Sequence, residues 1–163
     1  MKPLNGEHPL GDIGQLISLG LFLVVWVGDS FLLRKSTFLS SDVPLLFRLV
    51  ILGLALITAV CLLMSGHVVI RHEKRPSGVV STGAFRYVRH PLYLASLSSY
   101  LGLTISTMSI GSFLLLAGIV AFHNYIASYE ENWLEAKFGE EYRTYKEKTG
   151  KWIPRIWWII TKR

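Results

Sequence analysis

The longest uncharged stretch of the sequence contains the 36 residues from Leu92 to Ala127. One transmembrane helix needs about 20 apolar residues, so this stretch is too long for one crossing and short for two. Its midpoint, 106–111, reads Ser-Thr-Met-Ser-Ile-Gly and predicts a turn. Each arm then has about 15 residues and a length of about 22 Å, less than the hydrocarbon core of about 30 Å. We therefore predict a short helical hairpin that returns the chain to the side it left.

Two further apolar segments precede the hairpin. The chain is 51% hydrophobic and only 17% charged, whereas soluble domains average about 25% charged residues. At 163 residues it is short enough for a single domain. The sequence therefore predicts one all-α integral membrane domain, residues 1–163, with about four transmembrane helices at 13–33, 43–64, 92–106 and 110–127.

Single residues within these segments carry local predictions. Asp29 lies near the end of the first segment, where its carboxylate can reach the interface, meet Arg34 or serve a function inside the membrane. Gly66 is expected to end the second helix. Cys61, the only cysteine, lies inside that helix and is expected to be a small buried hydrophobic residue.

Basic residues are distributed unequally between the two sides. The polar loop 67–90 holds five lysines or arginines and the region after Tyr129 holds eight, whereas the opposite side has Arg34 and Lys35. The positive-inside rule places the loop, the C-terminal region 128–163 and the N-terminus in the cytoplasm, in an inner or plasma membrane. That region is predicted to form an amphipathic helix and an interfacial tail. The net charge is +6, and most of the lysines and arginines flank apolar segments. This placement favours binding to a membrane surface over binding to nucleic acid.

Polar chemistry concentrates where the hairpin begins and ends. Arg89-His90-Pro91-Leu92-Tyr93 precedes it and Glu130-Glu131 follows it, so a hairpin brings both to one membrane face. The free N–H groups of a helix that starts at Pro91 favour an anion, and the glutamate pair favours a cation. A zwitterionic small molecule matches both ends. The alternative is that the basic residues are topology signals and the glutamates a solvated helix start.

Metal binding is not expected. Four histidines, at 67, 72, 90 and 123, lack the tight spacing of zinc ligands. The sequence has no glycine-rich nucleotide-binding pattern either.

The two polar segments resemble the RHPxY–hydrophobic–EE signature of the isoprenylcysteine carboxyl methyltransferase and phospholipid methyltransferase superfamily. Residues 81–88, 138–145 and 152–155 are similar to the family's flanking segments, so the resemblance covers about residues 68–156. It departs from the usual pattern at Ala95, at 126–129 and at 149–150. The resemblance implies a membrane methyltransferase that uses S-adenosyl-L-methionine, in a pocket closed by the C-terminal segment. Arg89 would flank this pocket, formed by His90, Pro91, Tyr93, Glu130 and Glu131.

The methyl acceptor implied by the resemblance is lipophilic. A carboxylate acceptor, as in an isoprenylcysteine, needs no base and can be oriented by Arg155 or Arg86. An amine acceptor, as in a phospholipid N-methyltransferase, must lose a proton, and Glu131 or His90 is then the candidate base. The sequence is also compatible with a non-catalytic membrane subunit and with a reductase on a related scaffold. It leaves the oligomeric state open.

Overall fold

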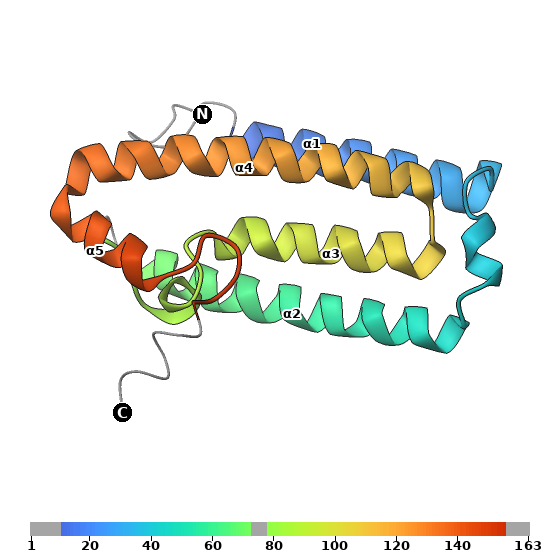
Figure 1. Cartoon of the computed structure of the whole chain (residues 1–163), viewed down its shortest axis with the longest axis horizontal. Coiled ribbons are helices and arrows are strands. Elements are labelled where there is room, and N and C mark those ends of the chain that lie inside the picture. The colour runs from blue at the N-terminus through green and yellow to red at the C-terminus, as the bar shows by residue number, and fades with distance from the viewer. Residues whose placement is uncertain (1–10, 73–77, 156–163) are drawn as a thin grey trace.

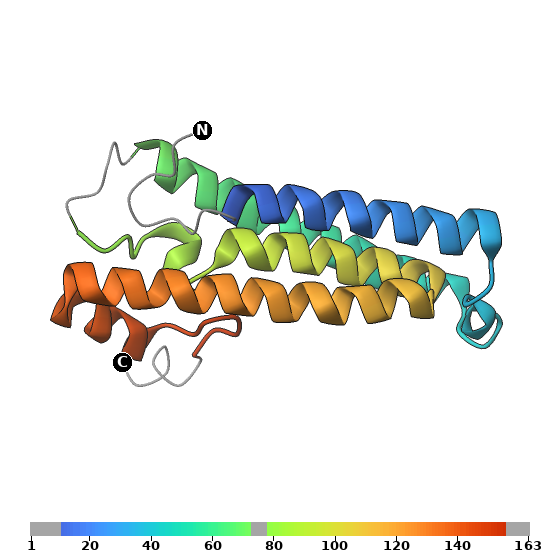
Figure 2. The same ribbon diagram turned by 90° about the horizontal axis from the view of Figure 1, so that it is seen from above.

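The computed structural model describes residues 11–72 and 78–155. Four long helices lie side by side in an elongated bundle (Figures 1 and 2). They are α1 (Gly11–Val27), which continues as the π-helix η1 (Gly28–Leu33), α2 (Leu45–His72), α3 (Pro91–Thr107) and α4 (Ile110–Phe138). Two 3₁₀ turns, η2 (Phe38–Ser41) and η3 (Gly83–Arg86), lie between them, and α5 (Glu140–Lys148) follows α4. No strand occurs in the described part of the chain, which confirms the all-α prediction.

The long helices have the length and composition of membrane spans. Three apolar stretches, Ile13–Leu33, Leu45–Gly66 and Ile110–Phe138, are long enough to cross a membrane. The 17 residues of α3 extend about 26 Å. This arm is somewhat longer than predicted and still shorter than a hydrocarbon core of about 30 Å. Most large apolar side chains of α1 and α2 face outward, which suits a lipid environment. The chain is a multi-pass membrane protein.

The predicted hairpin forms between α3 and α4. Met108 takes a left-handed conformation, with φ 55°, and ends α3. Ser109 caps α4 by accepting a hydrogen bond from the backbone N–H of Ser112 at 3.0 Å, because its hydroxyl satisfies a donor that the first turn leaves free. The turn predicted at 106–111 is confirmed.

Two helix ends differ from the prediction. The second helix continues beyond Gly66 to His72, because Gly66 is buried against Leu92, where a Cβ atom would lie 2.7 Å from Cδ2 of that leucine. Gly66 therefore permits close helix packing and does not end the helix. The fourth helix runs through residue 127 to Phe138 and ends at Gly139, with φ 55°. Glu130 and Glu131 thus belong to the same helix as the membrane span.

The inner packing of the bundle depends on aromatic residues. Phe22 of α1 is fully buried and stacks on Tyr100 of α3, with ring centroids 4.5 Å apart. Leu116 and Ile119 of α4 complete this cluster. The indole N–H of Trp26 donates to the Leu103 carbonyl at 3.0 Å. These contacts hold α1, α3 and α4 together along the middle of the bundle.

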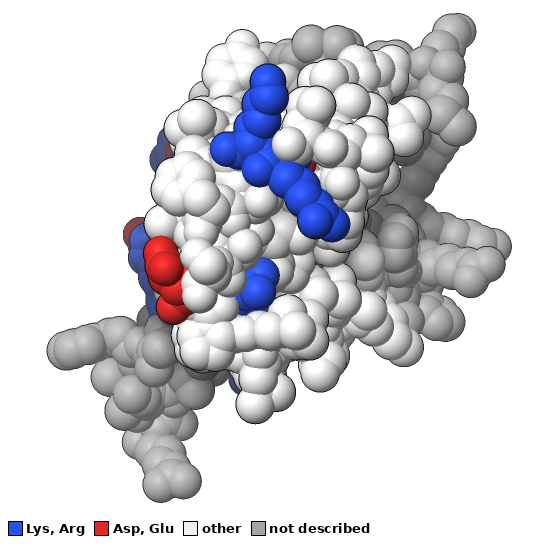
Figure 3. Space-filling model, turned by 90° about the vertical axis from the view of Figure 1, so that its right-hand side faces the viewer, with Lys and Arg blue, Asp and Glu red and all other residues white. Residues whose placement is uncertain are grey.

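The end of the bundle that holds the α3–α4 turn is tied together by Asp29. The Asp29 carboxylate accepts hydrogen bonds from the hydroxyls of Ser36 and Ser109, and the Ser36 hydroxyl accepts from the Gly111 N–H at 3.0 Å. A contact between the Asp29 carboxylate and Arg34 is not observed, because Arg34 is exposed and only its backbone N–H bonds to the Asp29 carbonyl. Figure 3 shows this end, where a few charged groups lie in a mostly uncharged surface.

We expect Asp29→Ala to lower the free energy of unfolding by about 1–3 kcal/mol, because it leaves two partly buried hydroxyls without their acceptor. Thermal unfolding of the detergent-purified protein measures this. Asp42→Ala, in the connection that follows η1, is the matched control, since Asp42 is exposed, and its effect should stay within about 0.5 kcal/mol. Equal effects of the two substitutions would contradict a structural role for Asp29.

Candidate functional site

The site lies at the end of the bundle where η3, α5 and the start of α3 meet (Figure 1). The segment before α3 is held by the C-terminal part of the chain. The Arg89 N–H donates to the Gly150 carbonyl at 2.9 Å, and the Tyr145 hydroxyl donates to the Phe85 carbonyl at 2.7 Å. Pro91 is the first residue of α3 and is buried, a position where its missing N–H costs nothing. The backbone around Arg89 and His90 is thus fixed from both sides.

Arg89 is the centre of a buried polar network. Its Nε lies 2.8 Å from Oε1 of Glu131, and both side chains are 7% exposed. Its Nη1 donates to the carbonyls of Thr149 at 2.6 Å and Lys146 at 3.1 Å. The guanidinium group therefore joins the start of α3 to α4 and to the end of α5. The resemblance implies a place for Arg89 beside the pocket, whereas the structure shows it buried between three segments.

His90 lies between the two glutamates. Its Nε2 is 3.1 Å from Oε1 of Glu131, and its Nδ1 is 3.7 Å from Oε2 of Glu130. Because a carboxylate only accepts hydrogen bonds, the contact with Glu131 requires the proton on Nε2. The hairpin therefore brings residues 41 positions apart into direct contact, as the sequence predicts.

Glu130 is the more accessible of the two carboxylates. Its side chain is 18% exposed, compared with 7% for Glu131. The Tyr93 hydroxyl donates to Oε1 of Glu130 at 2.6 Å, and the Tyr93 ring lies nearly parallel to the His90 ring. The start of α1 lies beside Tyr93 and Glu130, since a Cβ atom on Gly11 would be 3.8 Å from the Tyr93 hydroxyl oxygen and 3.8 Å from Oε1 of Glu130.

The C-terminal segment folds back over the site after α5. Trp152 lies beside His90, with ring centroids 5.7 Å apart, and its indole N–H donates to Oδ1 of Asn124 at 3.2 Å. The Lys151 ammonium donates to the Ser128 hydroxyl at 2.7 Å. Trp152 thus packs on the bundle, whereas the sequence places it in an interfacial tail. The tail beyond residue 155 lies outside the described residues.

Burial shapes the ionisation of the residues that follow α4. Burial raises the pKa of Tyr145 to about 12, and it also raises the pKa of Tyr142. Both phenols therefore stay neutral and remain hydrogen-bond donors at neutral pH. Burial lowers the pKa of Lys151, because desolvation disfavours its charged form.

The structure brings together most, but not all, of the predicted site residues. One contact network joins Arg89, His90, Tyr93, Glu130 and Glu131. Pro91 lies between two of its members in the sequence and begins α3. Arg155 lies apart from it in the described chain: it is exposed, and its Nη1 donates to the Glu147 carbonyl at 2.6 Å. Arg86 is also exposed. The roles of all these residues stay predictions.

Sequence reasoning missed Asn124 and Thr149. Asn124 precedes Glu131 by two helical turns, so helical periodicity places both residues on one face of α4. This signal is readable from the sequence. Thr149 contributes a backbone carbonyl to Arg89, and no residue pattern identifies such a contact. The described residues contain no group of three or more histidine, cysteine, aspartate or glutamate side chains placed to hold a metal ion.

Comparison with known proteins places these residues in a family. The phospholipid methyltransferase family model matches residues 49–141, more than half of the chain. An uncharacterized protein from Haemophilus influenzae is 38% identical over 51 residues, which cover 29% of this chain and 81% of that protein. No solved structure matches the chain. The family match includes the whole α3–α4 hairpin with Arg89 before it and both glutamates on it, and the chain therefore belongs to the phospholipid methyltransferase family.

Proposed function

We propose that this membrane methyltransferase uses S-adenosyl-L-methionine and transfers its methyl group to a lipophilic acceptor at the cytoplasmic face. The observation that carries the proposal is the convergence of the two motif segments, which surrounds one partly exposed carboxylate, Glu130, with Tyr93 and His90. Family membership supports the reaction class. The N- and C-termini would then lie in the cytoplasm, in an inner or plasma membrane.

The chemistry of the available groups fits the cofactor. S-adenosyl-L-methionine carries two cationic groups, a carboxylate and an aromatic base. The Glu130 carboxylate suits a cation. The rings of Tyr93 and His90 lie next to it, and Trp152 lies beside His90, so that a cation or a planar base would find favourable aromatic faces there. When bound, the cofactor supplies a methyl group that is already activated by its attachment to a sulfonium.

The two glutamates differ in their proposed roles. Glu131 is buried, and its oxygens already contact Arg89 and His90, so it would fix the position of the His90 ring. Glu130 retains solvent access beside Tyr93 and would contact the cofactor directly. Arg89 would act as a positioning residue, because it holds Glu131 and the C-terminal segment in place, and Pro91 would set the start of α3.

The acceptor determines which further groups are needed. Because the methyl group is already activated, alignment and exclusion of water would supply most of the rate. A carboxylate acceptor of the isoprenylcysteine type needs only a cation to orient it, and Arg155 would have to leave the Glu147 carbonyl to provide one. An amine acceptor, as in a phospholipid N-methyltransferase, needs a base, for which Glu131 and His90 are the candidates.

We expect Glu130→Gln and Tyr93→Phe each to weaken S-adenosyl-L-methionine binding about 10- to 100-fold, as the loss of a charge-assisted interaction of about 1.5–3 kcal/mol implies. Isothermal titration calorimetry of the detergent-purified protein measures this. Glu140→Gln is the matched control, since Glu140 is exposed on α5, and it should bind like the wild type. No binding by the wild type, or unchanged binding by both variants, would refute the proposed site.

Incubation with methyl-labelled cofactor and a total lipid extract identifies the acceptor. A labelled methyl ester indicates a carboxylate and a labelled ammonium lipid indicates an amine. Cofactor binding without a labelled product across a broad lipid panel would favour a non-catalytic membrane subunit.

A further inference from the structure

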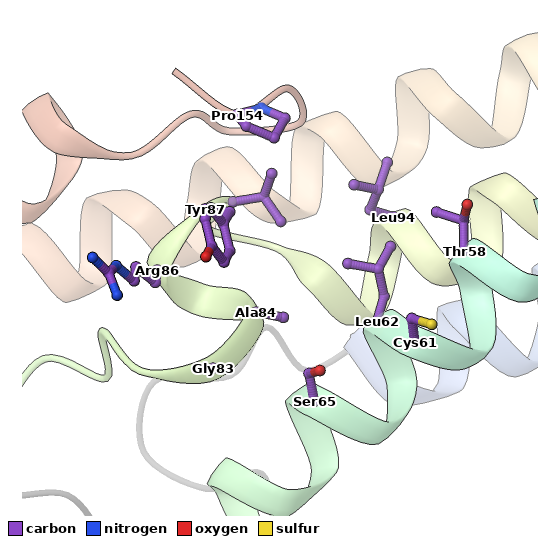
Figure 4. Close-up of a pocket in the computed structure, with 11 residues that line it drawn as sticks. Thr58, Cys61, Leu62, Ser65, Gly83, Ala84, Arg86, Tyr87, Leu94 and Pro154 are labelled. Atoms are coloured by element: carbon purple, nitrogen blue, oxygen red, sulfur yellow. The ribbon is translucent and has the colours of Figure 1, made fainter. Parts of the chain in front are cut away.

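A groove of about 610 Å³ lies on the other side of the segment that carries Arg89 (Figure 4). One wall belongs to α2, with Thr58, Cys61 and Leu62. Leu94 of α3 and the η3 segment form the opposite side, and Pro154 lies across it. Its volume falls in the range of about 300–1,000 Å³ that small-molecule pockets occupy.

The lining of the groove is mostly apolar, and its ends differ. Figure 4 shows Leu62, Cys61 and Leu94 together at one end and the Arg86 guanidinium at the other. Cys61 is exposed, contrary to its predicted burial. No described residue forms an ion pair with Arg86, whereas Arg89, three positions later, is fully paired. A hydrophobic groove that ends at a cation without an ion-pair partner among the described residues is suited to an amphiphile with a negative charge.

We propose that this groove binds the hydrocarbon chain of the acceptor lipid and that Arg86 binds the lipid's anionic group. This inference rests on the proposed function. The outer surface of α2 next to the groove is apolar, since Leu54 and Ile57 are 61% and 63% exposed, so a lipid chain can enter from the bilayer without crossing water.

The groove is also close to the proposed methyl donor site. Val88 is buried and lines the groove, and the next residue, Arg89, forms the ion pair with Glu131. The groove and the polar network therefore meet at neighbouring residues of one segment. A lipid anchored in the groove would therefore hold its headgroup at the edge of the Glu130 site, which a methyl acceptor requires. An annular lipid, which only surrounds the bundle, would not require a contact with Arg86.

Photo-crosslinking in nanodiscs tests the inference. The probes are a phosphatidic acid with a diazirine in its acyl chain and the matching uncharged diacylglycerol. Adducts should map to peptides that contain Cys61, Leu94 or Pro154. We expect Cys61→Phe, which fills the groove, to reduce these adducts about tenfold, corresponding to a loss of about 1.4 kcal/mol. Val60→Phe is the matched control, because Val60 is 53% exposed and does not line the groove.

Arg86→Gln should reduce the adducts of phosphatidic acid and leave those of diacylglycerol unchanged. Thr58→Phe serves as a second filling variant, and circular dichroism with thermal unfolding shows whether each variant is folded. Equal labelling of folded Cys61→Phe and Val60→Phe would show that the adducts come from annular lipid only, and it would overturn the inference. If the wild type does not bind S-adenosyl-L-methionine, the proposed function is refuted separately, since the crosslinking result does not depend on cofactor binding.

Discussion

Arg89→Ala is expected to lower the free energy of unfolding by about 3–5 kcal/mol, because it removes the guanidinium that compensates the buried Glu131 charge. The substitution also removes the donors that bind the Thr149 and Lys146 carbonyls. Three chain segments would lose their common contact. The α3–α4 hairpin should still form, since its turn lies at the opposite end of the bundle (Figure 1).

Thermal and denaturant unfolding of the detergent-purified protein measure this effect. Arg143→Ala is the matched control, because Arg143 pairs with Glu135 at 2.9 Å and Glu140 at 2.7 Å but is mostly exposed. Exposed ion pairs contribute about 0–1 kcal/mol, so the control should be nearly silent. Arg89→Lys should rescue only part of the loss, since an ammonium cannot reproduce the planar fork of the guanidinium. A loss no larger than that of Arg143→Ala would show that the buried pair is not structural.

The convergence of the two motif segments is predictable because it follows from the hairpin. A 36-residue uncharged run must turn inside the membrane, and the turn returns Glu130 to the face where His90 lies. The contacts of His90 with both glutamates confirm this geometry. Helical periodicity around Glu131 also indicates the position of Asn124 on the same face of α4.

The lengths of the helices and the burial of Arg89 are not predictable in the same way. Hydropathy shows where an apolar run ends, but α2 and α4 continue beyond their apolar runs to His72 and Phe138. In the sequence, Arg89 has the pattern of a topology signal, because it is a basic residue just before an apolar segment. Its burial is not visible there, because some of its partners are backbone carbonyls about 60 residues later in the sequence. The distribution of charged residues along the sequence does not reveal such contacts. The packing of Trp152 on His90 is hidden from the sequence for the same reason.

The turn that brings Trp152 onto His90 depends on a single glycine. Gly150 is buried, and a Cβ atom at this position would lie 1.7 Å from the Ile153 carbonyl oxygen and 2.8 Å from its carbon. Because both atoms belong to the backbone, no side-chain movement relieves the clash. The Gly150 carbonyl also accepts the Arg89 N–H at 2.9 Å. A change at Gly150 therefore acts on the turn and on the start of α3 together.

Gly150→Ala should lower the free energy of unfolding by about 1–3 kcal/mol, the usual cost of overpacking. It should weaken S-adenosyl-L-methionine binding at least about tenfold, because the displaced turn moves Trp152 away from His90. Calorimetry and thermal unfolding measure the two effects. Gly118→Ala is the matched control, since a Cβ atom there meets no other atom within 4 Å. If Gly150→Ala loses stability but binds the cofactor normally, the C-terminal segment closes no pocket. If it loses binding while circular dichroism shows the helices intact, the segment is part of the cofactor site.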